Sequence, residues 1–489
     1  MAARLTAYLV VFIVGATFIA GLIVGAQRDD SDGPVDLIVH NAVVFTGDAD
    51  GTTAEAVAVR ANQVLKVGSD REILRLQRPQ TIMVDAKGGS VLPGFNDAHL
   101  HLIEGGLQLF GVDLEGASTI EEVVERVKTW AEANPEAPWI TGHGWTEFAT
   151  DAAQPTRQAL DIAVGKRPVY LLSANGTAAW VNSGALAQAG IARRSNDPDG
   201  GRILKDKRGE PTGVLEGSAT ELVSSLLPKA SNDQRMRALL AAFAEAQRLG
   251  ITSVQASAND VEDLELFESA ARGGATDMRV YPVLEFDAPK TDAEISKLDP
   301  VLQQYADDPF IKSGAIEVEL EGVEADPLNR LVRLLDERGW QVSIEADAAE
   351  EVTLARTAFA HAARSNPKAV RERRHRLEHQ HRHFTQVGTT LALGSDWPRG
   401  PLAPMRVLQA AMARLSLKDA VRAYTFGSAF ASYDEERKGT LAPGMLADIV
   451  VLSANIFDLE PSLLDTVKIA HTIFDGRLVY SSERRTTVP

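Results

Sequence analysis

The sequence predicts an α/β fold in which a parallel sheet is joined to a smaller β-domain. Three observations lead to this prediction: the length of the chain, an alternation of strand-like and helix-like segments through its middle, and β-rich segments at both ends. At 489 residues the chain exceeds one ordinary domain. Because α/β barrels run to about 250 residues or more as single units, a barrel with a smaller companion fits this length.

Short strand-like segments lie at both ends of the chain. DLIVHNAVVFTG (36–47) and EAVAVRANQVLKVG (55–68) alternate apolar and polar residues, with turn residues between them. GTLAPGMLADIVVLS (439–453) and IAHTIFDGRLVYS (469–481) have the same character near the other end. Since these ends flank an α/β middle, we expect one small β-domain assembled from both of them. Its two parts are residues 35–90 and 438–489.

Strand-like and helix-like segments alternate through residues 91–437. TIEEVVERVKTWAEA (119–133) and NDQRMRALLAAFAEAQRLG (232–250) have the apolar spacing of amphipathic helices. The alternation favours a parallel barrel or a doubly wound sheet. Residues 135–230 are less regular and rich in turn residues, which predicts an insertion carried on an early loop. The expected strands that follow are ITSVQA (251–256), RVYPVL (279–284), IEVELEG (316–322), QVSIEAD (341–347), RHRLEH (374–379) and LALGSD (391–396).

The charge balance and the absence of cysteine limit the classes of function. The chain has 67 Asp and Glu against 50 Lys and Arg, a formal net charge of -17, so we expect no nucleic-acid partner. With no cysteine, disulfides and thiolate metal sites are excluded. Any metal ion must therefore be held by His, Asp, Glu or a modified Lys.

The N-terminal residues predict export of the rest of the chain. Residues 5–26 carry no charge and are long enough for a transmembrane helix, which needs about 20 residues. Residues 1–34 would then form a membrane anchor and linker, with the remainder anchored on the extracytoplasmic side, periplasmic or extracellular. A cleaved signal peptide is the alternative, because residues 24–26 offer a small-residue cleavage site, and the protein would then be secreted.

The stretch VLPGFNDAHLHL (91–102) contains the first candidate metal ligands. His99 and His101 are two residues apart, a spacing that directs both imidazoles to one side of a β-strand. Imidazole nitrogen is a preferred ligand for zinc. The two histidines are therefore candidate metal ligands, whose further ligands would lie elsewhere in the chain; the alternative at this point is a pair of half-exposed strand residues.

Two other expected strands direct carboxylates into the interior of the sheet. Because side chains alternate along a strand, the acidic residues of IEVELEG fall on the face opposite its apolar ones, and QVSIEAD repeats the pattern. Clustered carboxylates raise one another's pKa values and cannot all stay ionised without a cation. A metal ion or arginines must lie among them. The carboxylates are Glu317, Glu319, Glu321, Glu345 and Asp347, and the nearest arginines are Arg374 and Arg376.

Three motifs spread along the chain together resemble a known family. PGFNDAHLHL (93–102), LALGSDWP (391–398) and GTLAPGMLADIVVL (439–452) are similar to the metal-dependent amidohydrolase superfamily, specifically its amidohydrolase family 3 branch. This resemblance implies a distorted (β/α)8, TIM-like barrel with a β-sandwich formed from both chain ends. It also implies hydrolysis of non-peptide C–N bonds in amides, formamides or cyclic amides. Further matches are GHGW (142–145), residues 167–186, residues 197–217 and RHRLEH (374–379).

The resemblance implies a metal site at the carboxyl ends of the barrel strands. His99, His101, His379 and Asp396 match family ligands, and Asp396 would also be the catalytic general base. Two positions depart but still offer carboxylate ligands: Glu317 stands where the family has a carboxylated Lys, and Glu345 where it has a His. One of these two would bind the ion together with His99, His101 and either Asp396 or His379. Since a Glu carboxylate ends roughly 4 Å short of a carbamate, a bridge between two ions is hard to build, so we expect one zinc ion per chain. Four residues of the insertion would line or support the substrate pocket: His143, Trp145, Trp180 and Asn182.

The segment between RHRLEH (374–379), the sixth expected barrel strand, and LALGSD (391–396), the eighth, is too short to contain a seventh strand unit. Only 14 residues, 380–393, separate His379 from the GSD motif. A parallel crossover needs a dozen or more residues by itself. We therefore expect the seventh strand unit to be absent, with His379 and Asp396 on neighbouring strands.

Two functions of different class remain open. The first is a metal-dependent hydrolase of C–N bonds in a small-molecule substrate, in which Asp396 takes a proton from water and returns it to the departing amine. The second is a catalytically degenerate relative that serves as a membrane-anchored binding or assembly subunit, with an exposed sheet edge as its docking site. The oligomeric state and any protein partner are open as well.

Overall fold

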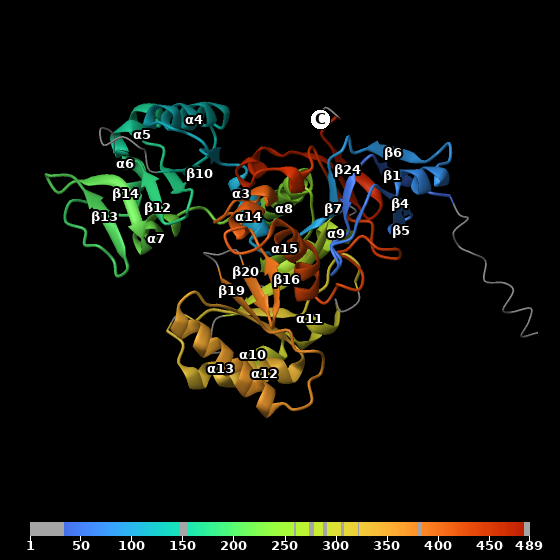
Figure 1. Cartoon of the computed structure of the whole chain (residues 1–489). Coiled ribbons are helices and arrows are strands. Elements are labelled where there is room, and N and C mark those ends of the chain that lie inside the picture. The colour runs from blue at the N-terminus through green and yellow to red at the C-terminus, as the bar shows by residue number, and fades with distance from the viewer. Residues whose placement is uncertain are drawn as a thin grey trace, which may run out of the picture.

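The barrel lies at the centre of the molecule, with the β-domain on one side and the insertion on the other (Figure 1). In the part of the chain that the structure describes, no helix is both long enough and apolar enough to cross a membrane. The predicted anchor over residues 5–26 lies outside the described residues. The computed structural model describes residues 34–146, 154–258, 261–272, 278–286, 291–304, 308–320, 322–379 and 384–483.

The central sheet is a nearly closed barrel, with neighbours in the order β21-β20-β19-β18-β17-β16-β15-β8. From β8 to β19 adjacent strands run parallel. The last gap is bridged by two bonds: the Asp396 N–H donates to the carbonyl of His99 at 2.9 Å, and the His101 N–H to that of Trp397 at 2.7 Å. The strands are β8 (Phe95–Leu100), β15 (Ile251–Ala258), β16 (Arg279–Phe286), β17 (Ala315–Val318), β18 (Gln341–Glu345), β19 (Arg376–His379), β20 (Phe384–Val387) and β21 (Thr390–Leu393).

A short antiparallel strand occupies the seventh position of the barrel. β20 runs antiparallel to both β19 and β21. It returns through a two-residue loop that begins at Gly388, whose φ of +60° suits glycine. The prediction that the strands of His379 and Asp396 are neighbours is therefore wrong, because β20 lies between them. An antiparallel return needs only a tight turn, so it fits in a segment too short for a parallel crossover.

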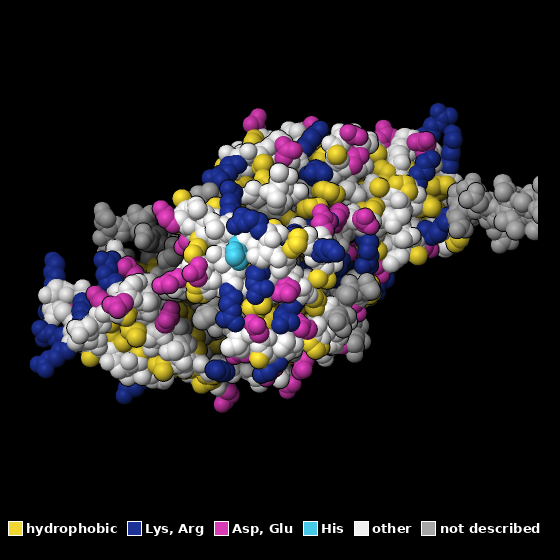
Figure 2. Space-filling view, turned by 90° about the horizontal axis from the view of Figure 1, so that it is seen from below, with side chains coloured by type: hydrophobic (Ala, Val, Ile, Leu, Met, Phe, Trp, Pro, Cys, Tyr) yellow, Lys and Arg dark blue, Asp and Glu magenta, His cyan; other side chains and the backbone are white. Residues whose placement is uncertain are grey.

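Helices cover the outside of the barrel. α12 shows why: Leu328, Leu331 and Leu335 are buried at helical spacing, and its opposite face carries Arg330 and Glu337. The surface in Figure 2 shows Lys and Arg interspersed with Asp and Glu. The helices are α3 (Leu102–Gln108), α8 (Asn232–Arg248), α9 (Val261–Arg272), α10 (Asp292–Ser296), α11 (Asp299–Gln304), α12 (Ala325–Arg338), α13 (Ala349–Ser365), α14 (Pro404–Ala411), α15 (Leu417–Arg422) and α16 (Ser428–Ala431).

The insertion has its own mixed sheet, in the order β13-β14-β12-β11-β10-β9, and its own buried core. This sheet begins at β9, before residue 135, where the sequence places the start of the insertion. Its strands are β9 (Val112–Asp113), β10 (Ile140–Trp145), β11 (Val169–Ser173), β12 (Ala178–Val181), β13 (Gly201–Lys205) and β14 (Pro211–Gly217), and its helices are α4 (Ile120–Ala133), α5 (Arg157–Val164), α6 (Ser183–Gln188) and α7 (Glu221–Ser224).

The β-domain consists of two sheets that pack face to face. The four-stranded sheet has the order β5-β4-β1-β6, and the six-stranded sheet, β24-β23-β22-β7-β2-β3, combines both ends of the chain. Apolar side chains of the two sheets, such as Val57 and Ile449, share one core. The strands are β1 (Leu37–His40), β2 (Val43–Phe45), β3 (Thr53–Ala54), β4 (Ala56–Arg60), β5 (Gln63–Gly68), β6 (Ile82–Asp85), β7 (Ser90–Pro93), β22 (Ile449–Leu452), β23 (Ile469–Phe474) and β24 (Arg477–Ser481), with the short helix α2 (Asp70–Ile73).

A buried ion pair joins the barrel to the β-domain, and breaking it should destabilise the protein. The guanidinium of Arg279 contacts Asp448 at 2.8 Å and Asp475 at 2.8 Å, and Arg279 and Asp448 are buried. Asp448→Ala is expected to cost about 3 to 5 kcal/mol, because the buried guanidinium loses a partner. Urea unfolding measures this. Asp292→Ala, which breaks an exposed pair with Arg330, is the control and should cost less than about 1 kcal/mol.

Candidate metal centre

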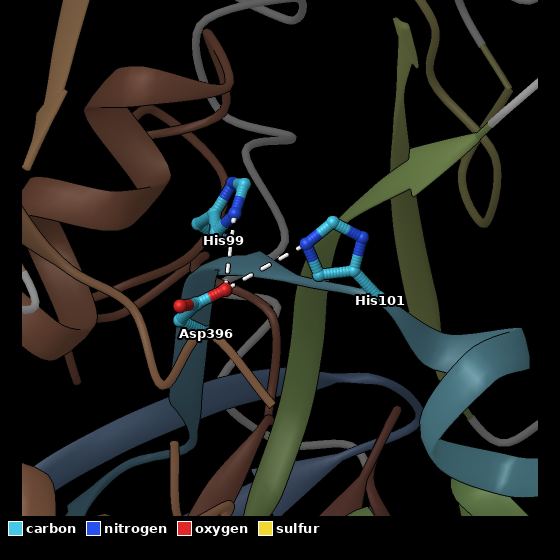
Figure 3. Close-up of side chains that lie close together, drawn as sticks. All are labelled: His99, His101 and Asp396. Atoms are coloured by element: carbon cyan, nitrogen blue, oxygen red, sulfur yellow. Dashed lines mark ion pairs between the residues drawn. The ribbon is translucent and has the colours of Figure 1, made fainter. Parts of the chain in front are cut away.

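Three side chains converge at the carboxyl ends of the first and last barrel strands (Figure 3). Nε2 of His99 lies 3.5 Å from Oδ1 of Asp396, and Nε2 of His101 lies 3.6 Å from the same oxygen. One ligand-type atom from each of these residues lies within 4.8 Å of the other two. The structure thus brings together three of the ligands predicted from the sequence.

The backbone around this group is held by a buried carboxylate. Asp97 accepts hydrogen bonds from the N–H of Ser395 at 2.9 Å, the N–H of His99 at 3.2 Å and the hydroxyl of Tyr424 at 2.7 Å. Burial raises the pKa of Asp97 to about 6, against the effect of these bonds. A Cβ at Gly394 would lie 2.7 Å from the amide nitrogen of His99, so glycine is required there. Asp97 and Gly394 together seat the GSD segment directly on β8.

Asp396 itself has a left-handed backbone, with φ of +54°. Such a conformation is uncommon for residues other than glycine, and Asp and Asn adopt it more readily than most. It turns the chain at the end of β21 and directs Oδ1 toward both imidazoles (Figure 3). Strained residues of this kind cluster at functional sites.

The donor set fits a divalent cation. Within the described part of the chain, the buried Nε2 of His99 and Oδ1 of Asp396 have no hydrogen-bond partner. Zinc bonds of 2.0 to 2.1 Å in a tetrahedral arrangement place neighbouring ligands about 3.3 Å apart. The observed separations of 3.5 and 3.6 Å are close to this value. An ion could therefore bind among these atoms with little movement of the side chains.

A guanidinium lies at the rim of the group. Arg399 donates a hydrogen bond to Nε2 of His101 and lies 3.7 Å from Oδ1 of Asp396 and 3.9 Å from Glu104. A donor on Nε2 of His101 competes with an ion for the same lone pair. The Arg399 side chain is 44% exposed, which leaves it free to turn outward when an ion binds.

A glutamate that the sequence analysis did not select holds the other nitrogen of His99. Oε2 of Glu378 lies 2.6 Å from Nδ1 of His99, and Oε1 lies 2.9 Å from the buried Arg376. Burial raises the pKa of Glu378, but the charges of His99 and Arg376 outweigh it and hold the pKa at about 2. Burial also lowers the pKa of His99, and the charges of Glu378 and Glu317 raise it well above its ordinary value instead.

Glu317 is not one of the three residues that converge as His99, His101 and Asp396, but it lies near His99. It is buried on β17 and accepts a hydrogen bond from the hydroxyl of Ser257 at 3.1 Å. Together with Glu378 it forms a second possible ligand group around His99. Burial and the charge of Glu378 raise the pKa of Glu317 to about 8.

Other carboxylates surround the site without joining either group. Burial, together with the charges of Glu378 and Asp396, raises the pKa of Glu345 to about 7, with His99 opposing. Glu285 of β16, which was not selected from the sequence, lies 3.6 Å from Nδ1 of His101. Glu319 is exposed because β17 ends at Val318, so its predicted inward position is wrong. Glu321 lies outside the described residues, and so does the side chain of His379, the last residue of β19.

Three of the four residues predicted to line or support the pocket are buried and make structural contacts. Trp180 is fully buried, and its indole N–H donates to the carbonyl of Thr156 at 3.1 Å. Trp145 packs edge-on against it, with ring centroids 6.3 Å apart, and donates to the carbonyl of Leu171. Asn182 is buried as the N-cap of α6. Of the two predicted roles, lining or supporting the pocket, these buried contacts are consistent with support, because the three side chains are enclosed within the insertion.

His143 differs from these neighbours. It is only partly buried, on β10, and its buried Nδ1 has no hydrogen-bond partner among the described residues. Burial lowers the pKa of His143, against the charges of Asp113 and Glu115. It is therefore the one predicted insertion residue that retains a free polar atom.

A β/α barrel that gathers two His and one Asp at the carboxyl ends of its strands has the fold and the ligand types of a metal-dependent enzyme. The amidohydrolase family model matches residues 83–383 and 381–480. The chain therefore belongs to the amidohydrolase family, as the three motifs predicted.

Similar proteins cover nearly the whole chain. LONG AFTER FAR-RED 3 of Arabidopsis thaliana is 28% identical over 91% of each chain, and YtcJ of Bacillus subtilis is 28% identical over 91% of this chain and 99% of its own. N-substituted formamide deformylase of Arthrobacter pascens is 24% identical over 91% and 98%. A metal-dependent hydrolase of Pyrococcus horikoshii has the same fold, with a TM-score of 0.63, 19% identity, and coverage of 87% and 99%.

Proposed function

We propose that this protein is a metal-dependent hydrolase of non-peptide C–N bonds. The observation that carries this proposal is the convergence of His99, His101 and Asp396 at the mouth of the barrel, with unpartnered donor atoms on His99 and Asp396. Amides, formamides and cyclic amides are the proposed substrates. Similarity to a formamide deformylase over nearly the full length supports this choice.

The proposed ion is a single zinc, held by the same three residues. Two imidazoles and one carboxylate are the ligand types that zinc takes in catalytic sites, which keep a further position open. When bound, such an ion acts as a Lewis acid and lowers the pKa of an attacking water.

Asp396 moves the proton in this proposal. Although burial raises the pKa of Asp396, the adjacent imidazoles of His101 and His99 and the charge of Arg399 hold it well below its usual range. The carboxylate is therefore ionised at neutral pH and can accept a proton from water. It then returns that proton to the nitrogen of the departing amine, which completes cleavage of the C–N bond. Arg399, at the rim, is placed to contact the substrate once it turns away from His101.

The purified protein is expected to hold no more than one tightly bound divalent ion per chain. A second ion beside His99 would need its Nδ1, which is already engaged by Glu378 at 2.6 Å. Metal content by mass spectrometry, on protein purified with added zinc, measures this, with His361→Ala as a variant away from the site. Two ions per chain would contradict the prediction.

The proposed activity is tested with a panel of amides, cyclic amides and N-formyl compounds. Release of the free amine should depend on added zinc and should be lost with a chelator. A protein that binds no ion and cleaves no member of the panel would overturn the proposal. It would favour the degenerate binding or assembly subunit instead.

A further inference from the structure

We propose that Glu378 is a positioning residue that, clamped by Arg376, fixes the imidazole of His99 so that Nε2 faces Asp396 and His101. The proposal rests on the proposed metal-binding function of that group. It assigns a role to a buried pair in the barrel interior that matches none of the ligand positions predicted from the sequence.

The contact between Glu378 and His99 determines which nitrogen of the ring is available. The 2.6 Å separation between Oε2 and Nδ1 is a close ion-pair contact, in which the carboxylate favours a proton on Nδ1. An ion binds His99 only when Nε2 has lost its proton, and a proton held on Nδ1 by Glu378 leaves Nε2, 3.5 Å from Asp396, as the nitrogen that can ligate. A carboxylate behind a ligand His commonly orients the ring and increases its basicity.

Glu378 is itself held from behind by a chain of buried polar side chains. Arg376, with no exposed surface, contacts Oε1 of Glu378 at 2.9 Å and donates to Oε1 of Gln255. The amide nitrogen of Gln255 donates to the carbonyl of Ser428 at 2.7 Å. The orientation of His99 is thus tied through three side chains to the first residue of α16.

A purely structural role does not account for this pair as well. A buried ion pair is weak in net stabilisation, because the cost of removing both charges from water offsets their attraction. Replacement of a buried ion pair by apolar side chains of similar volume is often neutral for stability or increases it. The arrangement does supply an oriented His99, which apolar side chains cannot do.

The first test is the affinity of the full-length protein for Zn²⁺, measured by competition with a chromophoric chelator. Glu378→Gln is expected to weaken binding about 10- to 100-fold, because the amide group cannot accept from both His99 and Arg376. Glu378→Asp, which keeps the charge, should recover part of the loss. Glu435→Gln is the matched control: it removes the same charge from beside another buried arginine, Arg374, which keeps Glu372. The affinity of the Glu435→Gln variant for Zn²⁺ should equal that of the unmutated protein.

The second test does not need a bound ion. In protein labelled with 15N-histidine, the Nδ1 proton of His99, assigned with His99→Gln, should resonate strongly downfield and should shift back in Glu378→Gln. If Glu378→Gln does not fold, Gln255→Leu is the alternative variant. Gln255 contacts neither His99 nor the proposed zinc, and its replacement should weaken zinc binding several-fold.

The outcomes separate the two proposals. If the unmutated protein binds no zinc but shows the downfield proton, the proposed function fails while the positioning role stands. If Glu378→Gln binds zinc as tightly as the unmutated protein, or leaves the His99 proton in place, the positioning role is overturned.

Discussion

Asp396→Asn is expected to lower turnover about 100-fold or more while leaving most of the bound ion in place. The amide cannot accept a proton from water, and loss of general acid–base catalysis costs about 100- to 10,000-fold. The asparagine amide does keep an oxygen at the position that Oδ1 of Asp396 now occupies. Asn also adopts left-handed backbone readily, so the φ of +54° at this position should survive the change.

Turnover and metal content are measured on the same preparation of Asp396→Asn. Glu104→Gln, at the rim beside Arg399, is the control for a general loss of negative charge. Full turnover in Asp396→Asn would remove Asp396 from proton transfer. Complete loss of the ion would mean that Asp396 acts mainly as a ligand.

His99→Ala is expected to remove both the ion and the activity. His99 supplies an unpartnered buried nitrogen to the group, and its loss also leaves Oε2 of Glu378 without its 2.6 Å contact. Zinc content should fall from about one ion per chain to nearly none, and turnover should fall to the rate of the uncatalysed reaction. Metal analysis and the hydrolysis panel measure the two effects.

Added imidazole sharpens the test of His99→Ala. The buried space left by the ring can admit a free imidazole, which should restore part of the zinc binding. His361→Ala, treated in the same way, should neither lose zinc nor respond to imidazole. An ion retained in His99→Ala would show that the site lies elsewhere in the barrel.

The ligands contributed by His99, His101 and Asp396 could be predicted because each belongs to a short motif on a strand end. Strand alternation sends the two imidazoles to one side, and the GSD segment follows the last strand directly. These are local properties of the chain. These local properties can be recognised in the sequence even though the motifs lie nearly 300 residues apart.

Glu378 was missed because its role depends on which face of β19 is turned inward. The sequence RLEH offers an acid and a His at adjacent positions, and only the register of β19 against β18, with Glu378 opposite Glu345, shows that the acid faces the interior. The buried Arg376, two residues earlier on the same face, is the signal that could have indicated it.

The sequence could not decide between the two roles predicted for the insertion residues. A Trp or Asn near a predicted pocket can contact substrate or fill a core, and the two roles leave the same residue in the sequence. Burial decides between them, and burial depends on packing between β11, β12 and their helices. Trp180 and Asn182 belong to that packing.

The antiparallel β20 changes how this barrel can acquire new specificity. In a complete barrel every strand ends at the catalytic face and contributes a loop there, and substrate preference varies through those loops. β20 ends at the opposite face, and only four residues connect β19 to it. One of the usual variable loops is thus reduced to a minimal connection. Lengthening that connection is a route by which an engineer could add a wall to the substrate pocket without disturbing His99, His101 or Asp396.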